Sequence, residues 1–148
     1  MLAGLQAGVL GGASMLAMLS VAAMFHGRSF WSASNLLATT FYGDDALRRG
    51  FRYSTLSGAA LLVILAAFLG VAFALATSRI HQRIRVRLLG LGFALAWFVL
   101  CDRALWSAVS PLVDIYAPTL DMTLGHIMLG FFLGSYPKYA ARIDALAE

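Results

Sequence analysis

The sequence predicts an all-α membrane protein: a four-transmembrane-helix bundle, one domain over residues 1–148, with an amphipathic interfacial helix in its first loop. Of the 148 residues, 61% are hydrophobic and 12% are charged, whereas a soluble domain is about half apolar and about a quarter charged. This composition excludes a soluble enzyme and a disordered tail. Cys101 is the single cysteine, so the chain cannot form an internal disulfide.

Four apolar stretches are long enough to cross the hydrocarbon core of a bilayer, which takes about 20 helical residues. They are residues 2–25, 55–77, 86–106 and 119–136. The first has no charge and no basic start, so we expect an uncleaved helix rather than a signal peptide. The third carries Arg87 at its start and Asp102 and Arg103 near its end, and the fourth is short because Pro137 ends it.

The first loop, residues 26–53, is long for so small a protein, and long loops are often functional. Between residues 29 and 43 its apolar side chains recur near helical spacing, which predicts a short amphipathic helix in the membrane interface. The residues expected at this interface are Phe30, Trp31, Leu36, Leu37, Phe41 and Tyr42. We expect a helix that covers the bundle end; the alternatives are a docking surface for a partner subunit or lipid, and a re-entrant catalytic element.

Lysine and arginine in the loops set the orientation of a membrane protein. On the side of the termini lie Arg79, Arg83, Arg85, Arg87, Lys138 and Arg142. On the other side lie Arg28, Arg48, Arg49, Arg52 and Arg103. The compact basic loop at residues 79–87 predicts that both termini face the cytoplasm of a bacterial inner membrane. Its four arginines are expected to contact anionic lipid headgroups rather than nucleic acid.

Small residues recur every four positions on two of the predicted spans. Gly4, Gly8 and Gly12 form such a stripe on the first helix, and Gly130 and Gly134 repeat the spacing on the fourth. Glycines at this spacing let two helix backbones approach closely in lipid. We therefore expect helices one and four to pack face to face, although the same stripe could meet a helix of another protein.

Ionisable residues inside a span are costly and mark a functional hypothesis. Asp102, Arg103, Asp121 and His126 are expected at similar depth, as an intramembrane polar cluster that holds helices three and four together. The alternative is that His126 ligates haem or chlorophyll. A second haem ligand is hard to find, because His26 lies at the interface and His81 in the opposite loop. No catalytic or metal-binding motif is present, so we expect neither an enzyme nor a metal site.

Three short runs and one residue pair carry a family resemblance: Ser29-Phe30-Trp31, Asn35-Leu36-Leu37-Ala38, Phe41-Tyr42-Gly43 and Gly125-His126. With the glycine-rich first helix, they resemble uncharacterised small bacterial four-helix membrane proteins of unknown function. The resemblance implies the four-helix fold and carries over no catalytic residue.

These observations predict a non-catalytic accessory or structural subunit of a larger bacterial inner-membrane complex, respiratory or photosynthetic, whose partners are other membrane subunits and the bilayer. One alternative is a haem- or chlorophyll-binding membrane subunit that uses His126. The other is a small transporter or channel through Asp102, Arg103 and His126.

Overall fold

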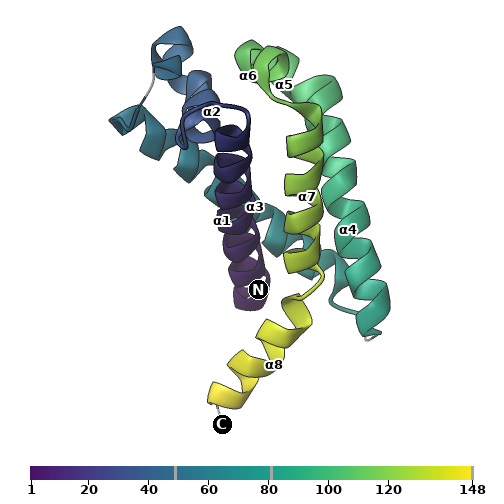
Figure 1. The fold of residues 1–148 in the computed structure, drawn as a ribbon. Coiled ribbons are helices and arrows are strands. Elements are labelled where there is room, and N and C mark those ends of the chain that lie inside the picture. The colour runs from purple at the N-terminus through teal and green to yellow at the C-terminus, as the bar shows by residue number, and fades with distance from the viewer. Residues whose placement is uncertain (49, 81, 148) are drawn as a thin grey trace.

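A computed structural model describes residues 1–48, 50–80 and 82–147, and these residues form helices joined by turns, with no strand (Figure 1). The α-helices are α1 (Leu2–Phe25), α2 (Ser32–Tyr42), α3 (Tyr53–Thr77), α4 (Arg83–Leu100), α5 (Trp106–Val109), α6 (Pro111–Tyr116), α7 (Thr119–Leu133) and α8 (Tyr136–Ala147). A 3₁₀ helix, η1 (Gly43–Leu47), follows α2, and a π-helical turn, η2 (Cys101–Leu105), joins α4 to α5. Arg49 and His81, which entered the loop-charge comparison and the search for a second haem ligand, lie outside the described residues.

Three of the described helices are long and apolar enough to cross a membrane: Leu2–Phe25, Tyr53–Thr77 and Arg83–Val109. The prediction of an all-helical fold is confirmed for the described residues, and three of the four predicted spans coincide with helices that could cross a membrane. The last of these helices is continuous through the π-helical turn, so it runs further at both ends than the predicted residues 86–106.

The fourth predicted span is shorter than the sequence suggested. α7 has 15 residues and ends at Leu133, and Gly134 and Ser135 then turn the chain into α8. Pro137 was expected to end the span, but it lies in the first turn of α8 instead. Proline fits there because the first helical N–H groups have no partner within the helix.

α3 crosses behind α1 at an angle, and α7 and α4 stand side by side next to α1 (Figure 1). α1 packs against α3 on one side and α7 on the other, and α4 packs mainly against α7. Both termini lie at one end, and α2 and α6 lie at the opposite end. We call this opposite end, residues 26–48, 50–52 and 110–118, the α2 end.

The glycine stripe of α1 faces α3 and not α7, so the predicted pairing of helices one and four through these residues is wrong. A Cβ atom on Gly8 would meet the carbonyl oxygen of Ala66, and one on Gly12 would lie 2.7 Å from the Cβ of Ala66. A Cβ on Gly4 would lie 2.6 Å from the carbonyl oxygen of Gly70. The spacing identified a close helix contact, but it carries no information about which neighbour the stripe faces.

α7 uses its glycines against α4. A Cβ on Gly130 would lie 2.8 Å from the Cα of Leu91, and one on Gly134 would lie 2.7 Å from the Cα of Arg87. Gly90 of α4 sits in the same contact, 2.6 Å from the Gly134 nitrogen by the same construction. α1 and α7 do pack together, but through other residues than those predicted, among them Gly11.

Candidate functional site at the α2 end

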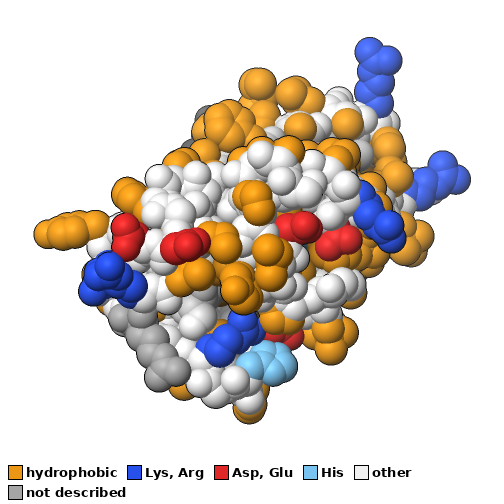
Figure 2. Space-filling view, turned by 90° about the horizontal axis from the view of Figure 1, so that it is seen from above, with side chains coloured by type: hydrophobic (Ala, Val, Ile, Leu, Met, Phe, Trp, Pro, Cys, Tyr) orange, Lys and Arg blue, Asp and Glu red, His pale blue; other side chains and the backbone are white. Residues whose placement is uncertain are grey.

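Polar side chains gather at the α2 end, where acidic and basic groups lie among apolar ones (Figure 2). Asn35, near the start of α2, is the centre of a buried network. Its Nδ2 donates to the carbonyl oxygens of Arg48 and Gly50, each at 3.1 Å, and its Oδ1 accepts from the Thr55 hydroxyl at 2.6 Å. The network ties α2 to the start of α3 and to the loop between them. It uses the hydrogen-bonding capacity of the Asn35 amide for structure rather than for a ligand.

A second buried contact joins α2 to α6. The Thr39 hydroxyl donates to the carbonyl oxygen of Leu36 at 2.6 Å. The hydroxyl of Ser110 lies 3.1 Å from the Thr39 hydroxyl oxygen. Because Thr39 has one proton and gives it to Leu36, Ser110 is the donor in the second bond. The polar face of α2 therefore points into the protein at this position.

Asp121 is bound by two residues that precede α2. It is buried at 7% exposure in the first turn of α7, where its charge also suits the positive end of the helix. His26 Nε2 lies 3.2 Å from one carboxylate oxygen, and Arg28 Nη2 lies 3.7 Å from the same oxygen. The predicted cluster placed Asp121 with Arg103 and His126, whereas the structure pairs it with His26 and Arg28.

Asp102 and Arg103 lie in the π-helical turn and contact each other, with 3.8 Å between Arg103 Nε and an Asp102 oxygen. The Arg103 side chain is 84% exposed, so it leaves the bundle instead of closing the predicted polar cluster. A π-helical turn adds one residue to a helical turn and rotates the residues that follow. Hydropathy gives no sign of such a turn. Of the predicted cluster, Asp102 contacts Arg103 and shares a cavity with His126, whereas Asp121 pairs with His26 and Arg28.

His126 is buried in the middle of α7. Its Nδ1 lies 2.7 Å from the carbonyl oxygen of Met122, and because a carbonyl only accepts, Nδ1 carries the proton. In the neutral ring Nε2 then keeps a free lone pair. The Phe98 ring lies beside the imidazole, with 5.1 Å between the ring centroids.

Two small cavities flank His126, each of about 30 Å³. One is lined mainly by apolar side chains, and the other is shared with Asp102, Asp114 and Thr119. Asp102 therefore does approach His126 across a cavity, although no hydrogen bond joins them in the described structure. Each cavity has room for about one water molecule.

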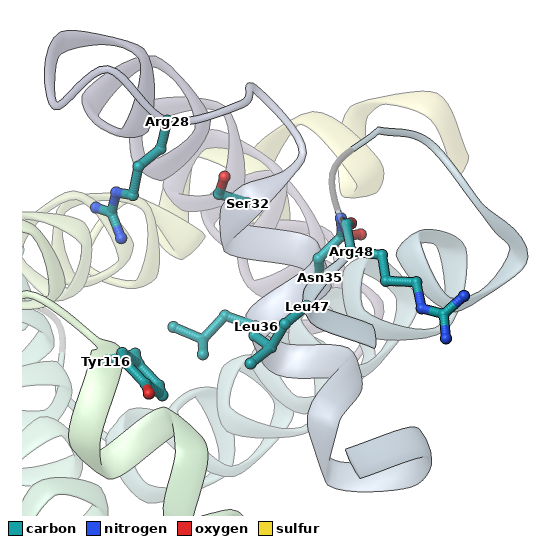
Figure 3. Close-up of a pocket in the computed structure, with 7 residues that line it drawn as sticks. All are labelled: Arg28, Ser32, Asn35, Leu36, Leu47, Arg48 and Tyr116. Carbon is teal, nitrogen blue, oxygen red and sulfur yellow. Dashed lines mark hydrogen bonds between the residues drawn. The ribbon is translucent and has the colours of Figure 1, made fainter. Parts of the chain in front are cut away.

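A larger pocket, of about 210 Å³, opens between α2, the loops that flank it, and α6. Figure 3 shows that the Arg28 guanidinium and Tyr116 lie on one side of the pocket with Leu36, whereas the Arg48 side chain points away from them. Both cations face a carboxylate of the same chain: Arg28 faces Asp121, and Arg48 lies 3.0 Å from Asp45. These carboxylates weaken the attraction of the pocket for an anion.

The six residues expected to form one interface separate into three groups. Leu36 and Leu37 are buried against Val113, so their assignment to a docking surface is wrong. Phe30 packs edge-on against Trp31, which packs in turn against Phe51. Phe41 and Tyr42 remain exposed beside α3.

Sequence reasoning missed His26 and Arg28 as partners of Asp121, and Asn35 and Thr55 as a buried pair. Asn35 offers one signal in the sequence, because asparagine is a weak helix former and its amide must be satisfied when a helix buries it. The pairing of His26 with Asp121 joins positions 95 residues apart, and nothing local marks it.

Among the described residues, no group of three or more His, Cys, Asp or Glu side chains is placed to hold a metal ion. Comparisons with protein-family models, with curated proteins and with solved structures find no match to this chain. The resemblance to uncharacterised small bacterial membrane proteins therefore remains a prediction, and the function rests on the residues themselves.

Proposed function

We propose that this chain is a non-catalytic accessory subunit of a larger membrane complex, with α4 as the helix that contacts the partner. The observation that carries the proposal is the open face of α4. In the most apolar part of the Arg83–Val109 helix, of which α4 is the larger portion, 22% of residues are buried, against 39% for α1 and 33% for α3. A bundle that buries one helix so little leaves a membrane-wide apolar face for another protein.

The use of the polar residues supports a structural role. Asn35 and Thr39 bond within the chain, and Asp121 is held by His26 and Arg28. The helix contacts are closed by glycine against backbone. These polar groups stabilise the bundle through bonds within the chain. Few of them remain to act on a substrate.

We further propose that α7 is a fourth span, so that the bundle is a four-transmembrane-helix protein with α2 near the membrane interface. At about 22 Å, α7 is shorter than the roughly 30 Å hydrocarbon core. It lies between α1 and α4, so these longer helices shield its ends from lipid.

The charge distribution supports the orientation proposed for a bacterial inner membrane, with both termini in the cytoplasm. The end with the termini has exposed Arg79, Arg83, Arg85 and Arg87, which are suited to anionic lipid headgroups. Asp44 and Asp45 lie at the α2 end, which would face the opposite side.

The test is co-purification of the tagged chain from native membranes in mild detergent. We expect a stoichiometric partner that Leu88→Trp and Val99→Trp release, because both side chains are exposed on α4. Val21→Trp, an exposed position on α1, is the matched control and should retain the partner. A stable monomer without co-purifying subunits would contradict the proposal.

A second candidate, haem or chlorophyll binding, is favoured by one observation. The Nδ1 of His126 is committed to a backbone carbonyl, which leaves Nε2 as the nitrogen that could ligate iron or magnesium. The two cavities beside it hold about 30 Å³ each, whereas ligand pockets usually measure about 300–1,000 Å³. An absorbance spectrum of the purified protein decides this, since a cofactor would give a strong visible band that His126→Ala removes.

The third function considered, a small transporter or channel, receives less support. From His126 towards the end with the termini, the core is formed by apolar side chains such as Leu129, Leu133 and Phe73. A polar path from Asp102 past His126 would have to continue through this region.

A further inference from the structure

Two open grooves adjoin along the outer face of α3 and share Tyr42 in their lining. The upper groove, of about 650 Å³, lies at the start of α3 beside Asp45 and Arg52. The lower groove, of about 580 Å³, continues along α3 past Ile64 to Phe68. Together they form one continuous surface, which we call the α3 groove.

The lower part of the α3 groove is apolar and exposed. Phe41 of α2 forms one wall, and Leu61, Ile64 and Phe68 of α3 form the floor and the other wall. Phe68 is 69% exposed, and no charged side chain lines this part. A linear hydrocarbon chain fits such a surface by burying apolar area on both sides.

The upper part carries one positive and one negative side chain. Arg52 lies just before α3, and Asp45 belongs to η1. Asp45 is paired with Arg48 at 3.0 Å, but its side chain is 80% exposed, and exposed pairs exchange partners readily. At the junction of the two parts, the hydroxyls of Tyr42 and Ser57 are hydrogen-bonded at 3.0 Å.

The length of the groove matches one leaflet of a bilayer. From Arg52 to Phe68 the chain advances sixteen helical positions, about 24 Å at about 1.5 Å per residue. One leaflet, headgroups included, is about 20–22 Å thick. A phospholipid whose headgroup lies at Arg52 would therefore extend an acyl chain to the level of Phe68.

We propose that the α3 groove binds one phospholipid whose headgroup carries both a phosphate and a primary ammonium, as phosphatidylethanolamine does. Arg52 contacts the phosphate, Asp45 accepts hydrogen bonds from the ammonium, and one acyl chain lies along α3. The charges select the headgroup: Asp45 repels a purely anionic headgroup, and a choline headgroup has no N–H to donate to it. The inference requires α3 to cross a bilayer and is independent of the accessory role of α4.

The experiment measures the lipid retained by the detergent-purified protein after exchange against equimolar phosphatidylethanolamine, phosphatidylglycerol and phosphatidylcholine, by native mass spectrometry. We expect one bound phosphatidylethanolamine per chain. Ala60→Trp fills the groove from an exposed position of α3 and should abolish retention. Ala76→Trp, exposed on the same helix but outside the groove, is its control and should leave retention unchanged.

Two exposed carboxylates test the headgroup assignment without disturbing the fold. Asp45→Asn should lower the preference for phosphatidylethanolamine over phosphatidylglycerol by about tenfold, the effect of losing one charge-assisted hydrogen bond. Asp44→Asn, next to it and outside the groove lining, should change nothing. Arg52→Gln should weaken all three phospholipids alike.

Three results would overturn the proposal. Equal retention of the three lipids by the unaltered chain would show that the charges select nothing. Unchanged retention in Ala60→Trp would place the lipid elsewhere. Should that variant fail to fold, an unchanged lipid preference in Asp45→Asn would overturn the headgroup assignment and with it the proposal. Recovery of a second protein chain in the groove, released by Ala60→Trp, would assign the surface to that protein.

Discussion

The close glycine contact between α1 and α3 offers a sharp test of the fold. In Gly8→Ala the new Cβ would meet backbone atoms of α3: the carbonyl oxygen of Ala66 and, at 2.8 Å, the Cα of Ala67. Ordinary contact for a Cβ begins at 3.4 Å, so α1 must move away by about 0.6 Å or more. Because the obstruction is backbone, no rotamer change relieves it. The whole stripe of α1 must then separate from α3.

Such overpacking costs about 1–3 kcal/mol. At about 2–4 °C for each kcal/mol in a chain of this size, the thermal midpoint should fall by about 2–12 °C. The assay is the loss of helical circular dichroism on heating in one detergent. Gly92→Ala is the matched control, because nothing lies within 4 Å of its Cβ and alanine favours a helix by up to about 1 kcal/mol. If both variants shift the midpoint equally, α1 and α3 are not in backbone contact.

Three further tests, made by the same unfolding assay, concern the α2 end and its contacts. Asn35→Ala removes the hydrogen-bond partner of the Arg48 and Gly50 carbonyls and of the Thr55 hydroxyl, and should lower the free energy of unfolding by about 1–3 kcal/mol for each of these groups that water does not reach. An unchanged midpoint would mean that water replaces the amide. Asp121→Asn and His26→Gln, measured singly and together, should give a coupling energy of about 0.5–1 kcal/mol. This value is low for a buried carboxylate because the imidazole of His26 is half exposed and solvent screens the pair. Additive effects of the two substitutions would contradict the pairing. Leu37→Ala removes a side chain that is 2% exposed and should cost about 2–5 kcal/mol, whereas Phe41→Ala should leave the midpoint unchanged; equal losses would place both side chains in the core.

The sequence predicts the long helices well because hydropathy is a local property. Residues 2–25 contain no charge or proline, and the predicted bounds coincide with those of α1. The prediction extended the fourth span past its true end at Leu133. Gly134 and Ser135 carry no charge that would mark the end of a span, yet their backbone turns the chain. α8 was not predicted, because the residues after Pro137 have the polar composition of a chain terminus.

The candidate site was predicted less well because it depends on how each helix is rotated. Periodicity identified the face of α2 that contains Leu36 and Leu37, but it assigned that face to the interface and not to the core. Asp121 and His126 share α7, yet one is held by the loop after α1 and the other by its own backbone. The partners of Asp121 lie more than ninety residues away in the sequence, and only the packed structure shows them.

The bundle consists of two helical hairpins, each formed by helices that are neighbours along the chain. α1 and α3 form the first hairpin and α4 and α7 the second, and a glycine contact closes each one. If the helices insert into a bilayer in chain order, the first hairpin can assemble as soon as α3 has been inserted. α4 has little contact with that hairpin, so it would stand unpaired beside one complete half of the bundle until α7 arrives.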